Sequence, residues 1–156
     1  MNGKWVGISL AAIGLIAGAT IYYLQVYAYY EKVDLETVDL RLTSVVSGQP
    51  EPITVDNLQA IDANSSPLRF RACFTTPISI AMLSETFVKY EHADPLVSPG
   101  WFDCFDATEI GEALETGSAV AFLAQKDIRE GIDRVVAVMA DGRAFAWHQL
   151  NEKLRE

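Results

Sequence analysis

Residues 5–24 read WVGISLAAIGLIAGATIYYL, a run of 20 residues without a charged side chain. A helix of this length spans about 30 Å, which is the thickness of the hydrocarbon core of a bilayer. Trp5 lies at one end of the run and tyrosines crowd the other end, as in the aromatic belts at membrane–water interfaces. These features predict a transmembrane anchor over residues 5–26, preceded by a cytoplasmic tip at residues 1–4.

A cleaved signal peptide is the alternative interpretation of this segment, because Ala17-Gly18-Ala19 has the small-x-small form of a cleavage site. Only Lys4 supplies a positive side chain ahead of the apolar run. The run also continues past Ala19 and ends in tyrosines, which is typical of an anchor. The sequence therefore favours a retained helix.

One face of the predicted anchor carries only small residues. Gly7, Ala11, Gly14 and Gly18 follow one another at helical spacing, and the last two form a GxxxG pair. Small residues let two backbones approach closely inside lipid. We expect this face to pack on a transmembrane helix of a larger inner-membrane complex, with self-association as the alternative.

The rest of the chain is acidic. The 156 residues include 12 basic and 21 acidic side chains, and Lys4 is the only charged residue among the first 30. Residues 31–156 thus carry 11 basic and 21 acidic side chains, net −10, which disfavours nucleic acid as a partner. The acid-rich flank of the anchor and an even number of cysteines favour a periplasmic location. We expect an aromatic and acidic connector at residues 27–38 and one periplasmic domain at residues 39–156.

Hydrophobic patterns predict an α+β fold for this domain, with an antiparallel sheet and about two helices. The alternating residues 39–46 and 68–74 predict strands, and Ile53–Val55 a short one, whereas residues 48–52 and 62–67 predict turns. Thr76-Pro77 predicts the start of a helix that ends near Thr86. Residues 89–100 lack periodicity and predict a surface loop. This half of the domain is thus predicted as strands followed by one helix.

The second half has clearer signals. Asp106, with Glu109 three residues later, predicts a helix N-terminus, and Gly117 predicts its end. The apolar run 119–124 predicts a buried strand. Asp141-Gly142 lies between two apolar runs, 133–140 and 143–148, which is a strong hairpin signal.

Cys73 and Cys104 are predicted to form a disulfide that closes a loop of about 30 residues. Free thiols are one alternative, and a copper or redox site with Met82, His92 or His148 is another. Metal ligands usually lie closer together in sequence. His92 and His148 are interpreted as surface or capping residues.

Five acidic residues follow one another without an intervening Lys or Arg: Asp103, Asp106, Glu109, Glu112 and Glu115. A solvated helix face is the simpler interpretation, since acidic residues are favoured near a helix N-terminus. The functional alternative is a docking surface for a basic partner such as a c-type cytochrome.

Common enzyme signatures are missing from the sequence, including Walker A, H-E-x-x-H, G-x-S-x-G and C-x-x-C motifs. The segments YYLQVYAYYE, SPLRFRACFTTP, GWFDCFDA and KDIREGIDRVVAVMADGRAFAWHQLNEK resemble an uncharacterised family of single-pass membrane proteins of alphaproteobacteria, carried as a domain of unknown function. The resemblance implies a bacterial inner-membrane setting and brings no activity, cofactor or catalytic residue.

We therefore expect a non-catalytic, membrane-anchored accessory or assembly subunit without a cofactor, which contacts membrane lipid and serves a respiratory or photosynthetic electron-transfer complex. A periplasmic thiol- or copper-handling factor and a homodimeric scaffold or sensor are the alternatives.

Overall fold

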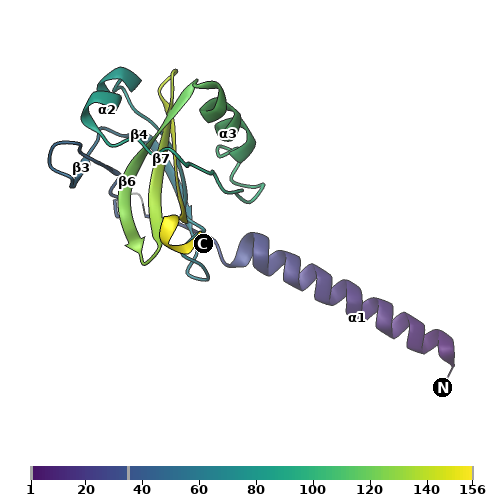
Figure 1. The fold of residues 1–156 in the computed structure, drawn as a ribbon. Helices are drawn as coiled ribbons and strands as arrows, with labels where there is room; N and C mark the ends of the chain where they lie inside the picture. The colour runs from purple at the N-terminus through teal and green to yellow at the C-terminus, as the bar shows by residue number, and fades with distance from the viewer. Residues whose placement is uncertain (1, 35, 156) are drawn as a thin grey trace.

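The computed structural model describes residues 2–34 and 36–155 and begins with a long helix that projects from a compact domain (Figure 1). Helix α1 (Gly3–Tyr23) continues into a π-helical turn, η1 (Leu24–Ala28), and buries none of its residues. Together they form an apolar helix of 26 residues with a mean hydropathy of 1.8, long enough to cross a membrane. The predicted N-terminal apolar helix is thus present and extends two residues further at each end.

The domain is built on a six-stranded antiparallel sheet with the strand order β1-β4-β5-β8-β7-β6. Its strands are β1 (Glu31–Lys32), β4 (Asp56–Asp62), β5 (Arg71–Thr75), β6 (Ala119–Arg129), β7 (Ile132–Met139) and β8 (Arg143–Leu150). The strands β2 (Arg41–Thr43) and β3 (Pro50–Pro52) form a separate two-stranded ladder. The predicted α+β class is confirmed.

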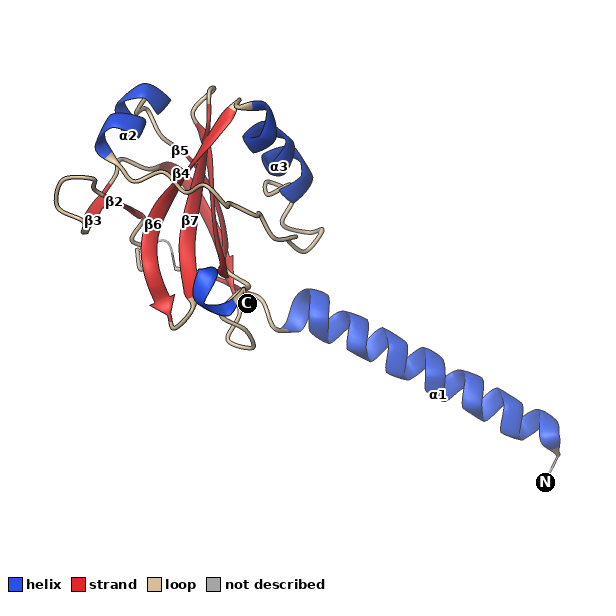
Figure 2. Cartoon of the chain, viewed as in Figure 1, coloured by secondary structure: helices blue, strands red, loops and turns tan. Residues whose placement is uncertain are grey.

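A helix covers each face of the sheet, as Figure 2 shows. On one side α2 (Ile80–Thr86) buries Leu83 against Phe70, Phe74 and Phe122. On the other side α3 (Ala107–Thr116) buries Ile110 in a second cluster that contains Trp147. A short 3-10 helix, η2 (Glu152–Leu154), follows the last strand. Two apolar cores therefore sandwich the central strands β5, β8 and β7.

Several predicted boundaries in the first half of the domain are wrong. The strand expected at residues 39–46 is reduced to β2, and β3 lies within the predicted turn 48–52 instead of at residues 53–55. β2 and β3 are short and pair outside the main sheet, so the alternation of apolar residues does not locate their ends. Strand β4 was not predicted, because only its last residues are buried. β5 begins at Arg71 instead of residue 68.

The start of α2 also differs from the prediction. Ser79 is the N-cap, and its hydroxyl accepts a hydrogen bond of 3.3 Å from the backbone N–H of Met82. Thr76 instead lies in the preceding turn, where its hydroxyl accepts from the N–H of Ile78. Thr76 and Ser79 are both suitable N-cap residues that precede the apolar stretch of α2, and Ser79 lies one turn closer to it. The capping preference of the residue type alone therefore could not identify the N-cap.

The second half follows the prediction more closely. Asp106 caps α3 by accepting hydrogen bonds from the N–H groups of Thr108 and Glu109, and Gly117 ends the helix with a left-handed φ of 76°. Asp141-Gly142 forms the turn between β7 and β8, with Gly142 at φ 88°. The strand predicted at residues 119–124 is present and continues to Arg129.

Strands β4 and β6 each carry an irregularity. Asn57 in β4 and Asp127 in β6 adopt left-handed backbone conformations, with φ of 53° and 47°. The register of each strand shifts at the same place. Such bulges bend an edge and discourage pairing with another chain. The edge strand β6 is therefore interrupted, and β4 is interrupted outside its short pairing with the edge strand β1.

Candidate functional site

The end of the apolar helix is hydrogen-bonded to the domain. The indole N–H of Trp101 donates to the carbonyl oxygen of Val26 over 2.6 Å, and Arg69 donates from Nη1 to the carbonyl oxygen of Gln25 over 3.4 Å. Both acceptors lie in η1. Carbonyl groups at a helix C-terminus lack intrahelical donors, so donors of the domain can satisfy them.

Aromatic packing reinforces this contact. The ring of Tyr27 stacks on Trp101 with centroids 6.4 Å apart, and Tyr30 meets Trp101 edge-on at 6.0 Å. The Arg69 guanidinium lies 5.4 Å from the centre of the Tyr30 ring. We call these contacts of Arg69 and Trp101 with residues 25–30 the anchor junction. They give the helix a defined orientation on the domain.

The loop that presents Trp101 is itself held firmly. Arg71 is buried and donates from Nε to the carbonyl of Leu96 over 2.9 Å and from Nη2 to that of Val97 over 3.0 Å. Burial lowers the pKa of Arg71 to about 10, which still leaves the guanidinium charged at neutral pH. In the alternating segment 68–74, Arg71 lies between the apolar residues Phe70 and Ala72, a pattern that predicts an exposed side chain. Arg71 is buried instead, because carbonyl acceptors compensate its charge.

The predicted disulfide between Cys73 and Cys104 is confirmed, with Cα atoms 6.3 Å apart. The disulfide ties β5 to the loop that carries Trp101, at a point three positions after this residue. The bond leaves no free thiol among the described residues, and Met82 and His92 are both exposed. His148 uses both ring nitrogens in protein hydrogen bonds. Within the described residues no three metal-ligating side chains gather at one point.

The small-residue face of the helix is open along its length. A side-chain carbon added at Gly7, Gly14 or Gly18 would meet no atom within 4 Å, and Ala11 is exposed. The space that the glycines leave is therefore available to another helix. Packing on a partner stays a prediction.

The five acidic residues Asp103, Asp106, Glu109, Glu112 and Glu115 are all exposed. Two of them have roles within the fold: Asp106 caps α3, and Glu109 forms an ion pair of 2.9 Å with Arg143. Arg143 lies in β8, far from Glu109 in the sequence, so the acidic segment itself gave no sign of this ion pair. The proposed docking surface thus keeps three unengaged acids, and its role as a docking surface stays a prediction.

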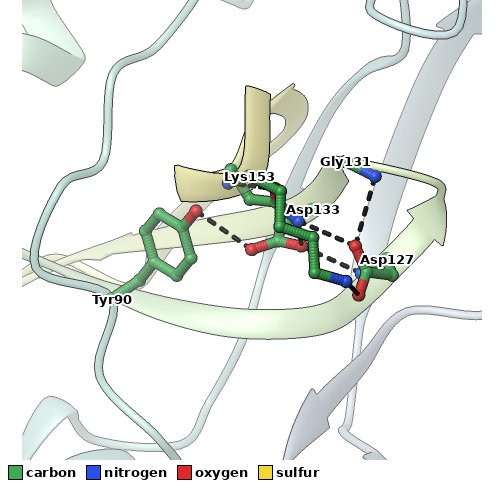
Figure 3. Close-up of polar contacts among 6 residues, drawn as sticks. Tyr90, Asp127, Gly131, Asp133 and Lys153 are labelled. Carbon is green, nitrogen blue, oxygen red and sulfur yellow. Dashed lines mark hydrogen bonds and ion pairs between the residues drawn. The ribbon is translucent and has the colours of Figure 1, made fainter. Parts of the chain in front are cut away.

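A polar cluster around Asp133 lies at the start of β7 (Figure 3). The Asp133 carboxylate accepts hydrogen bonds from the Tyr90 hydroxyl over 3.1 Å, from the Asp127 backbone N–H over 2.9 Å and from the Asn151 side-chain amide over 3.0 Å. Lys153 completes the cluster by donating to Asp127 over 2.7 Å. Burial and Asp133 raise the pKa of Tyr90 to about 12, so its hydroxyl stays a donor. These contacts fasten the C-terminal segment to the β6–β7 hairpin.

A cleft of about 1060 Å³ lies next to the segment that follows η1. Residues 31–34 line it, together with Asp62, Arg134 and His148 of the sheet. Arg134 stacks 4.3 Å over the Phe70 ring and donates from Nε to Nε2 of His148 over 3.0 Å.

His148 is buried in β8, and the interpretation of it as a surface or capping residue is wrong. Its Nδ1–H donates to the carbonyl of Pro67 over 2.7 Å, which leaves Nε2 as the acceptor for Arg134. Burial, followed by the charge of Arg134, lowers the His148 pKa to about 4. The strand pattern could have indicated its burial, since Ala146 and Leu150 lie two positions away on the same face of β8 and are apolar.

Comparison with known proteins gives one match. The sequence model of a family of unknown function, DUF6446, matches residues 40–156, and the chain belongs to this family. No curated protein and no solved structure matches the chain. The match covers the domain and leaves out the apolar helix.

Proposed function

We propose that this member of DUF6446 is a non-catalytic accessory or assembly subunit, anchored in a bacterial inner membrane by residues 3–28 and bound there to a larger complex. The observation that carries the proposal is the anchor junction. A flexible linker would let the domain sample many orientations. A domain hydrogen-bonded to its own helix keeps one orientation, which suits a subunit whose helix and domain bind the same complex together.

The disulfide and the apolar helix support an extracytoplasmic domain, since disulfides persist in oxidising compartments. We place the N-terminus in the cytoplasm and the domain in the periplasm. On the helix, the open Gly7, Ala11, Gly14 and Gly18 face is the proposed contact with a helix of the complex.

On the domain, the exposed acids Asp103, Glu112 and Glu115 offer a second contact. Their charge would attract a basic partner such as a c-type cytochrome, and exposed charges of this kind mainly raise association rates. For this reason we favour a respiratory or photosynthetic electron-transfer complex as the host. Binding through this surface should weaken as salt is added.

Purification in mild detergent tests the proposal through the variant Gly14→Leu. A Cβ added at Gly14 would meet no atom of the described residues within 4 Å, so the variant should fold and insert normally. It should hold a partner helix away and lose the complex. Ala12→Leu is the matched control, because the same side chain is added outside the small-residue face. We expect mass spectrometry to recover the complex with wild type and Ala12→Leu, and at least tenfold less with Gly14→Leu.

Two results would contradict the proposal. Equal recovery of partner proteins with Gly14→Leu and Ala12→Leu would show that the face is exposed to lipid. Recovery of the chain alone, as a dimer that Gly14→Leu dissociates, would instead support a homodimeric scaffold.

A further inference from the structure

The cleft next to the segment that follows η1 contains charged side chains that have no ion-pair partner among the described residues. In the described part of the chain, no carboxylate oxygen lies within 4 Å of the Arg134 guanidinium. Arg134 has one hydrogen bond, from Nε to His148, so its two terminal nitrogens have no protein acceptor among the described residues. No buried side-chain nitrogen or oxygen in that part of the chain lacks a partner. The two terminal nitrogens therefore reach the solvent of the cleft.

The Arg134 guanidinium is also held in place before any ligand arrives. Phe70 supports one side of it, and the neutral ring of His148 accepts its Nε–H. A guanidinium fixed in this way loses little side-chain freedom on binding, and its planar fork matches the oxygens of a phosphate. Lys32 and Arg129 line the same cleft and add positive charge.

Negative charge lies in the same cleft. Asp62 is partly buried, and its one side-chain hydrogen bond comes from the N–H of Ala63 to Oδ1, over 2.8 Å. No Lys or Arg nitrogen of the described residues lies within 4 Å of its carboxylate. Burial raises the pKa of Asp62, as expected for a carboxylate that lacks a close cation. Glu31, Asp34 and Glu130 also line this cleft. Arg134 and Asp62 favour each other's charged forms through space, but no ion pair within 4 Å joins them, so each keeps polar atoms free for a ligand.

The position of the cleft limits which ligand can reach it. Residues 31–34 begin three positions after η1 ends at Ala28. A 26-residue helix is about 39 Å long, whereas the hydrocarbon core is about 30 Å thick, so its last turn reaches the headgroup layer. In the proposed orientation, the wall of the cleft formed by residues 31–34 thus lies at the level of the lipid headgroups.

We infer that this cleft binds a phosphoethanolamine-type zwitterion, with Arg134 on the phosphate and Asp62 on the ammonium. A phosphatidylethanolamine headgroup is the source that the position favours, and free phosphoethanolamine has the same chemistry. The lipid source rests on the proposed membrane anchoring, whereas binding of the zwitterion does not. Bound lipid would fix the height of the domain above the membrane, in addition to its orientation.

Calorimetric titration of the full chain in uncharged maltoside micelles tests this inference. The probes are dihexanoyl phosphatidylethanolamine, free phosphoethanolamine and dihexanoyl phosphatidylglycerol, which has the phosphate without the ammonium. We expect both ethanolamine compounds to bind at least tenfold more tightly than the glycerol lipid. Tighter binding of the short-chain lipid than of the free compound identifies a membrane source, and equal binding identifies a soluble one.

Variants assign the binding to the two residues. Arg134→Gln and Asp62→Asn should each weaken binding of the ethanolamine probes at least tenfold, and Arg134→Lys should have an intermediate effect. Arg41→Gln is the control, because Arg41 lies in β2 outside the cleft. Thermal unfolding of each variant verifies that the fold is intact, and Arg134→Lys replaces Arg134→Gln if the latter unfolds.

Three results would overturn the inference: no binding by the wild type, equal binding of the ethanolamine and glycerol lipids, or wild-type affinity in both Arg134→Gln and Asp62→Asn. The test uses the purified chain without a partner. Its failure is therefore separate from failure of the co-purification experiment, which tests the accessory function.

Discussion

His148 is a buried titratable residue, and the sign of its effect on the pH dependence of stability follows from its lowered pKa. The folded pKa is about 4, below the ordinary 6.5, so the unfolded chain binds a proton between these values and the folded chain does not. The free energy of unfolding therefore falls as the pH drops from 6.5 to 4, and His148 contributes about 3 kcal/mol to this fall. Below the folded pKa, the contribution of His148 changes no further.

Denaturant unfolding at several pH values tests this effect. His148→Gln should remove that part of the pH dependence, since glutamine does not titrate and can still accept from Arg134. His92→Gln, at an exposed site, should keep the wild-type slope. An unchanged slope in His148→Gln would contradict the assignment.

Asp106 and Asp103 belong to the same acidic segment but differ in what they contact. Asp106 satisfies two N–H groups at the start of α3, so Asp106→Ala should lower the free energy of unfolding by about 1 kcal/mol. Asp103 is exposed, and Asp103→Ala should stay within about 0.5 kcal/mol of wild type. Equal effects of the two variants would show that the cap is not formed.

The disulfide acts at the scale of elements, because it joins β5 to the loop that carries Trp101. Cys73 and Cys104 are 31 positions apart, and closing such a loop stabilises the fold by about 3–4 kcal/mol in the chain-entropy model. The double variant Cys73→Ala/Cys104→Ala should lose about that much in denaturant unfolding. An unfolding midpoint equal to that of the wild type would contradict a stabilising role.

How far the elements could be predicted depends on where their partners lie. The Asp141-Gly142 turn, the Asp106 cap and the long apolar helix were predictable because turn, capping and length signals are local. β4 and the short β2–β3 ladder were missed because tertiary pairing decides them and few of their residues are buried.

The same distinction holds for the candidate sites. The cysteine pairing was predictable from compartment and number, although it spans 31 positions. The anchor junction was not, because Trp101 lies 75 positions from its acceptor at Val26. The cleft joins residues from five strands, β1, β4, β6, β7 and β8, and Arg134 and His148 each look ordinary alone.

On the scale of the whole molecule, the proposed function requires the apolar helix and the domain to move as one body. The helix leaves the domain in a single direction (Figure 1), and the contacts of Trp101 and Arg69 with η1 fix that direction. Helix and domain could then meet one complex together, with the cleft near the headgroups.

Distance measurement between two spin labels in a phospholipid bilayer tests this claim most directly. Labels introduced as unnatural amino acids at Leu10 and Val46, both exposed, leave the disulfide intact. We predict one narrow distance distribution for the wild type, and a broad one for Trp101→Ala, which removes the hydrogen bond and the stacking on Tyr27. A broad wild-type distribution that Trp101→Ala leaves unchanged would contradict the account.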